Sequence, residues 1–162
     1  MTLNARSEAV RRRLLRPWNF RVYLWARLPL AACAGLSLRR LDDTGCTVAL
    51  PGGWRTQNPF RSMYFAAQSM AAEMSTGAPA MMLAEGALAS VSMLVREVRG
   101  VFTRRIQGEA EFTFEELPAM QATIDRAVAT GESESYVARS VGRNRDGGAA
   151  AEFEITWSFK RR

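Results

Sequence analysis

Glu73 has the setting in which a carboxylate can do chemistry. It is the only acidic residue between Asp43 and Glu85, and its sequence neighbours are small or apolar. If a helix buries it, loss of hydration will raise its pKa toward the range useful to a general base. Ser62 and Ser69 fall on the same helical face and could orient a water molecule. Alternatively, Glu73 pairs with an arginine or faces solvent near the end of that helix.

A long helix must position these side chains. Asn58 precedes Pro59, which gives a favoured N-cap followed by proline at the first helical position. Gly77 and Pro79 then close the segment, so the sequence predicts a helix over about residues 59–76. Its many alanines and its methionine stripe (Met63, Ala67, Met70, Met74) indicate that it is buried on several sides.

The start of this helix is the second chemically useful feature. Unpaired backbone N–H groups and the positive end of the helix dipole suit an oxygen that gains negative charge. Asn58 is then either a simple cap or a ligand of the substrate, and Gln68 could contact a ligand from the far side of the helix.

Composition narrows the classes of function. The chain has 162 residues, of which 48% are hydrophobic, so one ordered domain is expected. It contains no histidine, which excludes a histidine-based triad, general base or metal ligand. Cys33 and Cys46 lack metal spacing and are expected to be reduced. We therefore expect no metal and no cofactor.

The net charge of +6 comes almost entirely from arginine. It is compatible with nucleic acid, an anionic membrane or a phosphate-bearing ligand, and also with the codon bias of a GC-rich genome. Because the basic residues are dispersed and no stacking motif accompanies them, we expect no nucleic-acid partner.

Residues 1–34 form an arginine-studded leader that is expected to be partly helical. Leu28 to Cys33 imitates a lipoprotein cleavage box, but Arg21 and Arg27 interrupt the apolar run before it. We therefore expect no export signal and a cytoplasmic location. The aromatic cluster between Pro17 and Pro29 has two interpretations: a helix that packs its aromatic side on the core, which we favour, or a membrane-surface anchor.

Strands are predicted for much of the rest of the chain. Segments 36–41 and 46–50 predict a hairpin, and alternating residues predict strands from residue 88 onward. The clearest strand is the last, with Phe153, Ile155, Trp157 and Phe159 on one face. A shorter helix is expected over 117–130, opened by Pro118. The pattern predicts an α+β domain in which an antiparallel sheet curls around one helix.

The block Asn-Pro-Phe-Arg-Ser-Met-Tyr-Phe-Ala-Ala, from Asn58 to Ala67, resembles the core motif of a bacterial hotdog family, domain of unknown function 4442. Residues 17–21 and 28–35 are similar to that family's leader, so the resemblance covers nearly the whole chain. It implies a hotdog fold, with leader 1–34 and core 35–162 in one domain, and a homodimer or dimer of dimers. At the level of the superfamily it implies acyl thioesters of coenzyme A or acyl carrier protein as ligands.

The resemblance also suggests roles for particular residues. In many hotdog thioesterases an acid on the central helix is base or nucleophile, a role that here would fall to Glu73. Asn58 and Ser69 complete the expected catalytic set. The expected substrate-binding residues line the helix start or could hold coenzyme A phosphates: Ser62, Met63, Tyr64, Gln68, Arg104 and Arg105.

One departure leaves two functions open. Relatives of the phenylacetate-pathway type carry His-Gly-Gly before the helix, whereas Tyr64 to Ala67 occupies that region here. The chain is expected to be an acyl-thioester hydrolase or, alternatively, a module that binds an acyl chain or lipid without turnover.

Overall fold

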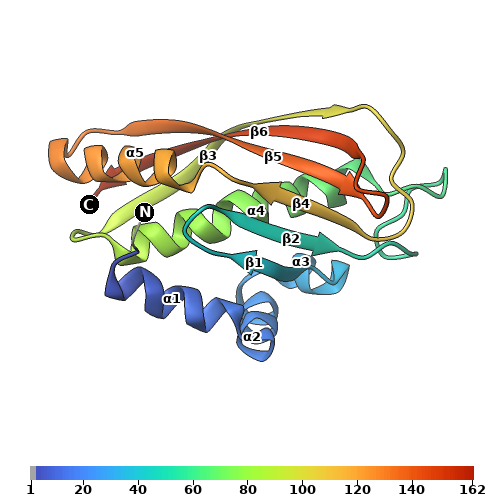
Figure 1. Ribbon diagram of the computed structural model, residues 1–162, viewed down its shortest axis with the longest axis horizontal. Coiled ribbons are helices and arrows are strands. Elements are labelled where there is room, and N and C mark those ends of the chain that lie inside the picture. The colour runs from blue at the N-terminus through green and yellow to red at the C-terminus, as the bar shows by residue number, and fades with distance from the viewer. Residues whose placement is uncertain (1–2) are drawn as a thin grey trace.

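An antiparallel sheet of six strands curves around one long helix in the computed structural model, which describes residues 3–162 (Figure 1). The five helices are α1 (Ala5–Leu15), α2 (Pro17–Arg27), α3 (Pro29–Ala34), α4 (Phe65–Gly86) and α5 (Leu117–Thr130). The six strands are β1 (Ser37–Leu41), β2 (Cys46–Leu50), β3 (Val91–Phe102), β4 (Ala110–Phe114), β5 (Glu134–Asn144) and β6 (Ala149–Arg161).

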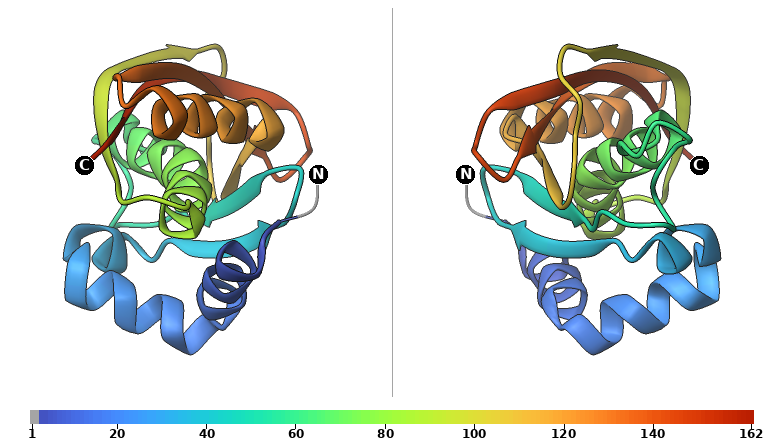
Figure 2. Two further views of the ribbon diagram at one scale, coloured as in Figure 1. Left: turned by 90° about the vertical axis from the view of Figure 1, so that its left-hand side faces the viewer. Right: turned by 90° about the vertical axis from the view of Figure 1, so that its right-hand side faces the viewer.

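The strands lie in the order β1-β2-β4-β5-β6-β3, and every neighbouring pair is antiparallel. Helices α4 and α5 lie side by side within the curve of the sheet, and the leader helices cover the side of α4 that the sheet leaves open (Figure 2). Strands β1 and β3 form the two edges of the sheet. The predicted α+β fold with a wrapped central helix is therefore confirmed.

Alternation in β6 supplies much of the core. Phe153, Ile155, Trp157 and Phe159 are all buried, while the residues between them are only partly buried. Because successive side chains of a strand point to opposite faces, this pattern buries one face of the sheet against α4 and α5. The predicted hairpin of β1 and β2 and the predicted helix α5 are also confirmed.

The central helix begins and ends later than expected. It was predicted over residues 59–76, but α4 spans Phe65–Gly86, so Gly77 and Pro79 lie inside it. Glycine and proline cost a helix interior about 1 and about 3 kcal/mol respectively. Burial outweighs this penalty, because 13 of the 22 residues of α4 are buried. Glu73 consequently lies in the middle of the helix and not in its last turn.

Asn58 does not cap the helix, contrary to expectation. Its side-chain oxygen accepts hydrogen bonds from the backbone N–H groups of Phe60 (2.9 Å) and Ser62 (3.2 Å) and so closes a local turn. Met63 then donates its N–H to the carbonyl of Ile106 (2.9 Å), which keeps the chain extended. The Asn-Pro pair is typical of a helix start, but here the asparagine side chain closes a turn. Asparagine can do either, because its side-chain oxygen accepts hydrogen bonds from nearby backbone N–H groups in both structures.

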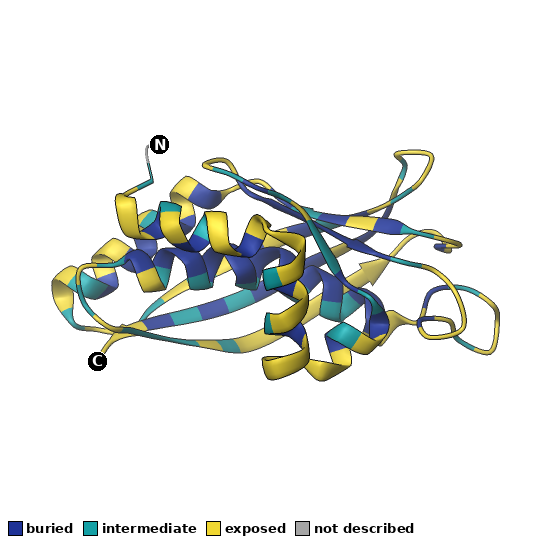
Figure 3. Cartoon of the chain, turned by 90° about the horizontal axis from the view of Figure 1, so that it is seen from below, coloured by how far each residue is buried: buried dark blue, intermediate teal, exposed yellow. Residues whose placement is uncertain are grey.

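The leader packs through one face only. Phe20 and Leu24 of α2 are buried, whereas Trp18, Val22 and Trp25 are exposed, so the favoured interpretation of an aromatic side packed on the core is wrong for both tryptophans. Viewed from below, the outer surfaces of the leader helices are largely exposed (Figure 3). Within residues 3–162 no helix is both long and apolar enough to cross a membrane.

Candidate functional site

A cavity of about 340 Å³ lies at the start of α4, and we call it the helix-start pocket. Its wall is formed by the turn before α4, the first turn of α4 and the segment after β3. The residues that line it are Asn58, Ser62, Met63, Phe65, Gln68, Phe102, Thr103, Arg104, Arg105 and Ile106.

Backbone donors are available at this end of α4. The N-cap residue, Tyr64, makes no side-chain hydrogen bond to the helix. The N–H groups of the first turn (residues 65–67) have no acceptor within the helix, because such acceptors would have to precede it. Phe65 and Gln68 line the cavity, so this turn borders it. The pocket therefore combines unpaired donors with the positive end of a 22-residue helix.

Gln68 brings an unpaired acceptor to the same cavity. Its side chain is buried, with 5% exposed, and Nε2 donates to the Met63 carbonyl (3.0 Å). Its Oε1 is buried without a hydrogen-bond partner among the described residues. A buried, unpaired carbonyl oxygen costs about 1–3 kcal/mol, so a donor from a ligand or a water would stabilise this arrangement.

Two arginines give the pocket a positive rim. Arg104 pairs with Asp146 (3.1 Å), so part of its charge is already compensated. Arg105 forms no ion pair with the described residues, and its backbone carbonyl accepts a hydrogen bond from Asn144 (3.4 Å). Arg105 is thus the freer of the two to meet an anion.

Glu73 lies in a different cavity, of about 230 Å³, which we call the Glu73 cavity. Burial raises the pKa of the Glu73 carboxyl, and no ion pair or hydrogen bond to that carboxyl is found in the described part of the chain. The other residues that line this cavity are mainly apolar: Leu14, Phe20, Tyr23, Leu28, Met74, Gly77, Ala78, Met81, Met93 and Trp157.

Glycine at position 77 lets the carboxylate and an indole ring approach each other. A Cβ added there would lie 2.7 Å from Glu73 Oε1 and 3.2 Å from Cζ2 of Trp157. The carboxylate is therefore close to an aromatic surface and to no cation, a setting that favours its protonated form. This is the environment expected of a carboxyl poised for proton transfer, although the cavity holds no second charged group.

The structure brings together six of the nine predicted site residues and separates three. Those that line the helix-start pocket are Asn58, Ser62, Met63, Gln68, Arg104 and Arg105. Glu73 is turned away because five residues of an α-helix rotate a side chain by about 140° from Gln68.

The remaining two lie outside both cavities. The Ser69 hydroxyl donates to the Phe65 carbonyl (2.9 Å), and Tyr64 is 44% exposed and packs on the Phe65 ring. The expected set of Glu73 with Ser69 and Ser62 around one water is therefore not assembled within a single chain.

Sequence reasoning missed several cavity residues. Phe65 and Phe102 form an edge-to-face pair (6.4 Å between ring centroids) on the wall of the helix-start pocket, and Tyr23 and Trp157 enclose Glu73. The alternation of β6 could have placed Trp157 against the helix. The aromatic cluster of the leader includes Tyr23 but does not place it beside Glu73, and no pattern marks Phe102, since both positions depend on how distant elements pack.

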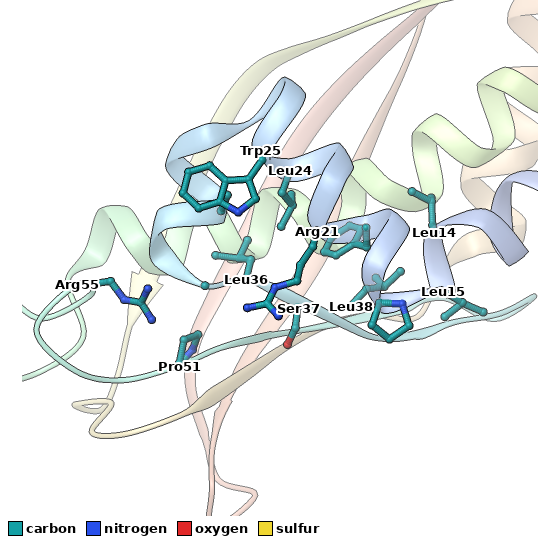
Figure 4. Close-up of a pocket in the computed structure, with 14 residues that line it drawn as sticks. Leu14, Leu15, Arg21, Leu24, Trp25, Leu36, Ser37, Leu38, Pro51 and Arg55 are labelled. Carbon is teal, nitrogen blue, oxygen red and sulfur yellow. The ribbon is translucent and has the colours of Figure 1, made fainter.

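A third cavity, of about 360 Å³, separates the leader from β1 and the segment after β2 (Figure 4). We call it the leader cavity. Leu24, Leu36 and Pro51 contribute apolar surface, while the guanidinium groups of Arg21 and Arg55 approach it from two sides. No acidic residue lines it.

Comparison with known proteins identifies the fold. No family model matches the chain, and no curated protein matches its sequence. Among solved structures it is similar to a protein of unknown function from Chlorobaculum tepidum, with a TM-score of 0.76, 12% identity, and coverage of 91% of this chain and 98% of that one.

Two further structures carry thioesterase descriptions. One is a Pseudomonas aeruginosa protein of unknown function described as a thioesterase candidate (TM-score 0.71, 17% identity, 90% of this chain and 97% of that one). The other is a thioesterase from Haemophilus influenzae (0.65, 11% identity, 86% and 88%). At these identities the likeness shows the fold alone, which is the hotdog fold.

Proposed function

We propose that this chain binds acyl thioesters of coenzyme A or acyl carrier protein in the helix-start pocket and hydrolyses them. The observation that carries the proposal is the meeting of unpaired donors and an unpaired acceptor in one cavity. The first turn of α4 offers the donors, and Gln68 Oε1 is the acceptor. The thioesterase descriptions of structures with the same fold agree with it by analogy.

The donors and the acceptor suit different atoms of the reaction. Hydrolysis begins when water attacks the thioester carbonyl carbon, whose oxygen gains negative charge. The C–S bond then breaks, and a carboxylic acid and a thiol are released. N–H groups at the start of α4 stabilise the developing oxyanion, and Gln68 Oε1 can accept a hydrogen bond from the attacking water. Arg104 and Arg105 suit the phosphates of the carrier.

The general base that takes a proton from the attacking water must come from outside the helix-start pocket, because Glu73 lies in another cavity of the same chain. A second copy would provide it if two chains form a homodimer with the Glu73 of one near the pocket of the other. Strand β3 favours such a dimer. Among the described residues it is a 12-residue edge strand that pairs with β6 on one side, and its residue Phe102 lines the helix-start pocket. Pairing two β3 edges would extend the sheet.

Release of free thiol from acyl-coenzyme A of several chain lengths tests hydrolysis. We expect release by the purified protein, loss in Glu73→Ala, and retention in Glu85→Ala, which removes another carboxylate from the same helix. Absence of release by the wild type, or equal release by the Glu73 variant, would remove the proposed mechanism. Sedimentation of the same samples tests the dimer, since a monomer could not complete the site.

A second candidate function, acyl binding without turnover, is favoured by one observation. Glu73 and Gln68 line separate cavities, and each cavity is bordered by methionine, which adapts to flexible ligands. Native mass spectrometry of the purified protein distinguishes the two. A co-purified acyl ligand without thiol release supports binding alone, whereas an empty protein that releases thiol contradicts it.

A further inference from the structure

Helix α2 is apolar on two opposite sides. Phe20 and Leu24 face the core with 4% and 1% of their surface exposed. Trp18, Val22 and Trp25 follow the spacing i, i+4, i+7, which places them together on the opposite side of the helix. Their exposed fractions are 75%, 51% and 60%, and nothing in the described part of the chain covers them. We call this stripe the outer face of α2.

The same segment carries the net positive charge of the chain. Residues 1–34 contain seven arginines and one glutamate, whereas the remaining residues contain fifteen basic and fifteen acidic side chains. The net charge of +6 therefore belongs to the leader. Arg21 and Arg27 of α2 form no ion pair with the described residues, unlike Arg11 and Arg13, which pair with glutamates.

The leader cavity adds a pocket for an anion beside this face. Trp25 belongs both to the outer face and to the cavity wall, and Arg21 and Arg55 bring their guanidinium groups toward the same space from different elements (Figure 4). Neither forms an ion pair with a described residue, and no carboxylate lines the cavity. Two free guanidinium groups above apolar walls suit a phosphate attached to an acyl chain.

We propose that the outer face of α2 docks on an anionic lipid bilayer, with a headgroup phosphate held between Arg21 and Arg55. Tryptophan beside arginine is the side-chain combination that lies well at a membrane interface, where the ring reaches the acyl boundary and the charge meets acidic headgroups. The proposal does not depend on thioester hydrolysis, because the outer face and the helix-start pocket share no residue.

A second copy of the chain fits this face less well than a bilayer does. Contact between two such faces would bring together two leaders that each contain seven arginines and only one glutamate. Like charges across an interface repel and oppose association. An anionic bilayer offers the opposite sign of charge and an apolar interior to the same residues.

Sedimentation of the full chain with vesicles tests the proposal. We expect binding to phosphatidylcholine vesicles that contain phosphatidylserine, none to pure phosphatidylcholine, and weaker binding as salt increases. A blue shift of tryptophan fluorescence should accompany binding. Failure to bind the anionic vesicles at low salt would overturn the proposal.

Variants then locate the contact. Arg21→Ala should lower the partition coefficient by about fivefold, since each basic residue near an anionic surface contributes about 1 kcal/mol. Arg145→Ala removes the same charge from an exposed position outside the leader and should have a much smaller effect. An equal loss in both variants would overturn the assignment to α2.

Two more variants examine the apolar stripe and the phosphate pocket. Trp18→Ala with Trp25→Ala should abolish the fluorescence shift and weaken binding while circular dichroism stays unchanged, because Trp18 and Trp25 are exposed. Arg55→Ala should weaken binding although it lies outside the leader. If the tryptophan variant instead changes the oligomeric state and leaves vesicle binding intact, the face joins copies of this chain and the proposal is wrong.

Discussion

The indole N–H of Trp157 donates a hydrogen bond of 2.9 Å to the hydroxyl of Thr76, and both groups are buried. This contact joins β6 to the middle of α4 and sets the position of the ring that encloses Glu73. It also accounts for glycine at position 77, because a Cβ there would lie 2.7 Å from Glu73 Oε1 and 3.2 Å from Cζ2 of this ring. The wall of the Glu73 cavity is thus fixed by a polar contact in an apolar surrounding.

Replacing Thr76 by valine should therefore destabilise the fold. Valine has nearly the shape of threonine but no hydroxyl, so the buried indole N–H would lose its acceptor. We expect the free energy of unfolding in urea to fall by about 1–3 kcal/mol. Thr76→Ser keeps the hydroxyl, so it should keep most of the stability that the valine variant loses. A valine variant as stable as the wild type would show that the hydrogen bond contributes nothing.

Glu73 should make the stability depend on pH. Because burial raises its pKa in the folded state, the folded protein binds a proton more tightly than the unfolded chain. The free energy of unfolding therefore falls as pH rises from about 4.3, the ordinary pKa of glutamate, through the raised value. Glu73→Gln lacks this loss, so it should gain stability over the wild type with increasing pH. Denaturant unfolding of both proteins at several pH values measures the difference, and a difference that is independent of pH would contradict the assignment.

The two cysteines should differ sharply in reactivity. Cys33 is exposed, whereas Cys46 in β2 is completely buried and its burial raises the pKa of the thiol. Since the thiolate is the reactive form, the native protein should react with Ellman's reagent at Cys33 and release the second equivalent only after unfolding. A Cys33→Ser variant that shows no fast reaction would complete the test. Fast reaction of both thiols in the native state would contradict the burial of β2.

The parts of the fold that could be predicted are those decided by local pattern. The alternation of β6 and the Leu117-Pro118 start of α5 each contain their own signal, and both elements appear as expected. The ends of α4 could not be predicted in this way. The Asn58 side chain can close a turn as readily as it can cap a helix. Pro79 is tolerated inside α4 because burial against distant strands outweighs its local cost.

In the candidate site, too, the contacts made by distant elements could not be predicted from the sequence. Ser62 and Gln68 meet in one cavity at the start of α4, although the sequence predicted them on different sides of the helix. Grouping Glu73 with Ser69 failed because the shared helical face says nothing about which distant elements cover it. Tyr23 and Trp157 cover Glu73 from the leader and from β6, and no spacing within the helix reveals them.

Gln68 should matter more for binding than for stability. Gln68→Leu removes one hydrogen bond to the Met63 carbonyl, but it also removes the unpaired buried Oε1. These effects oppose each other, so we expect the free energy of unfolding to change by no more than about 1 kcal/mol. Acyl-coenzyme A affinity or thiol release should fall about tenfold, because a hydrogen bond to a buried group contributes about 1–2 kcal/mol to a bound ligand. Gln121→Leu, at a half-buried position of α5 outside both cavities, is the matched control and should change neither quantity. A Gln68 variant that unfolds easily yet binds and turns over ligand like the wild type would show that this side chain supports the fold and not the pocket.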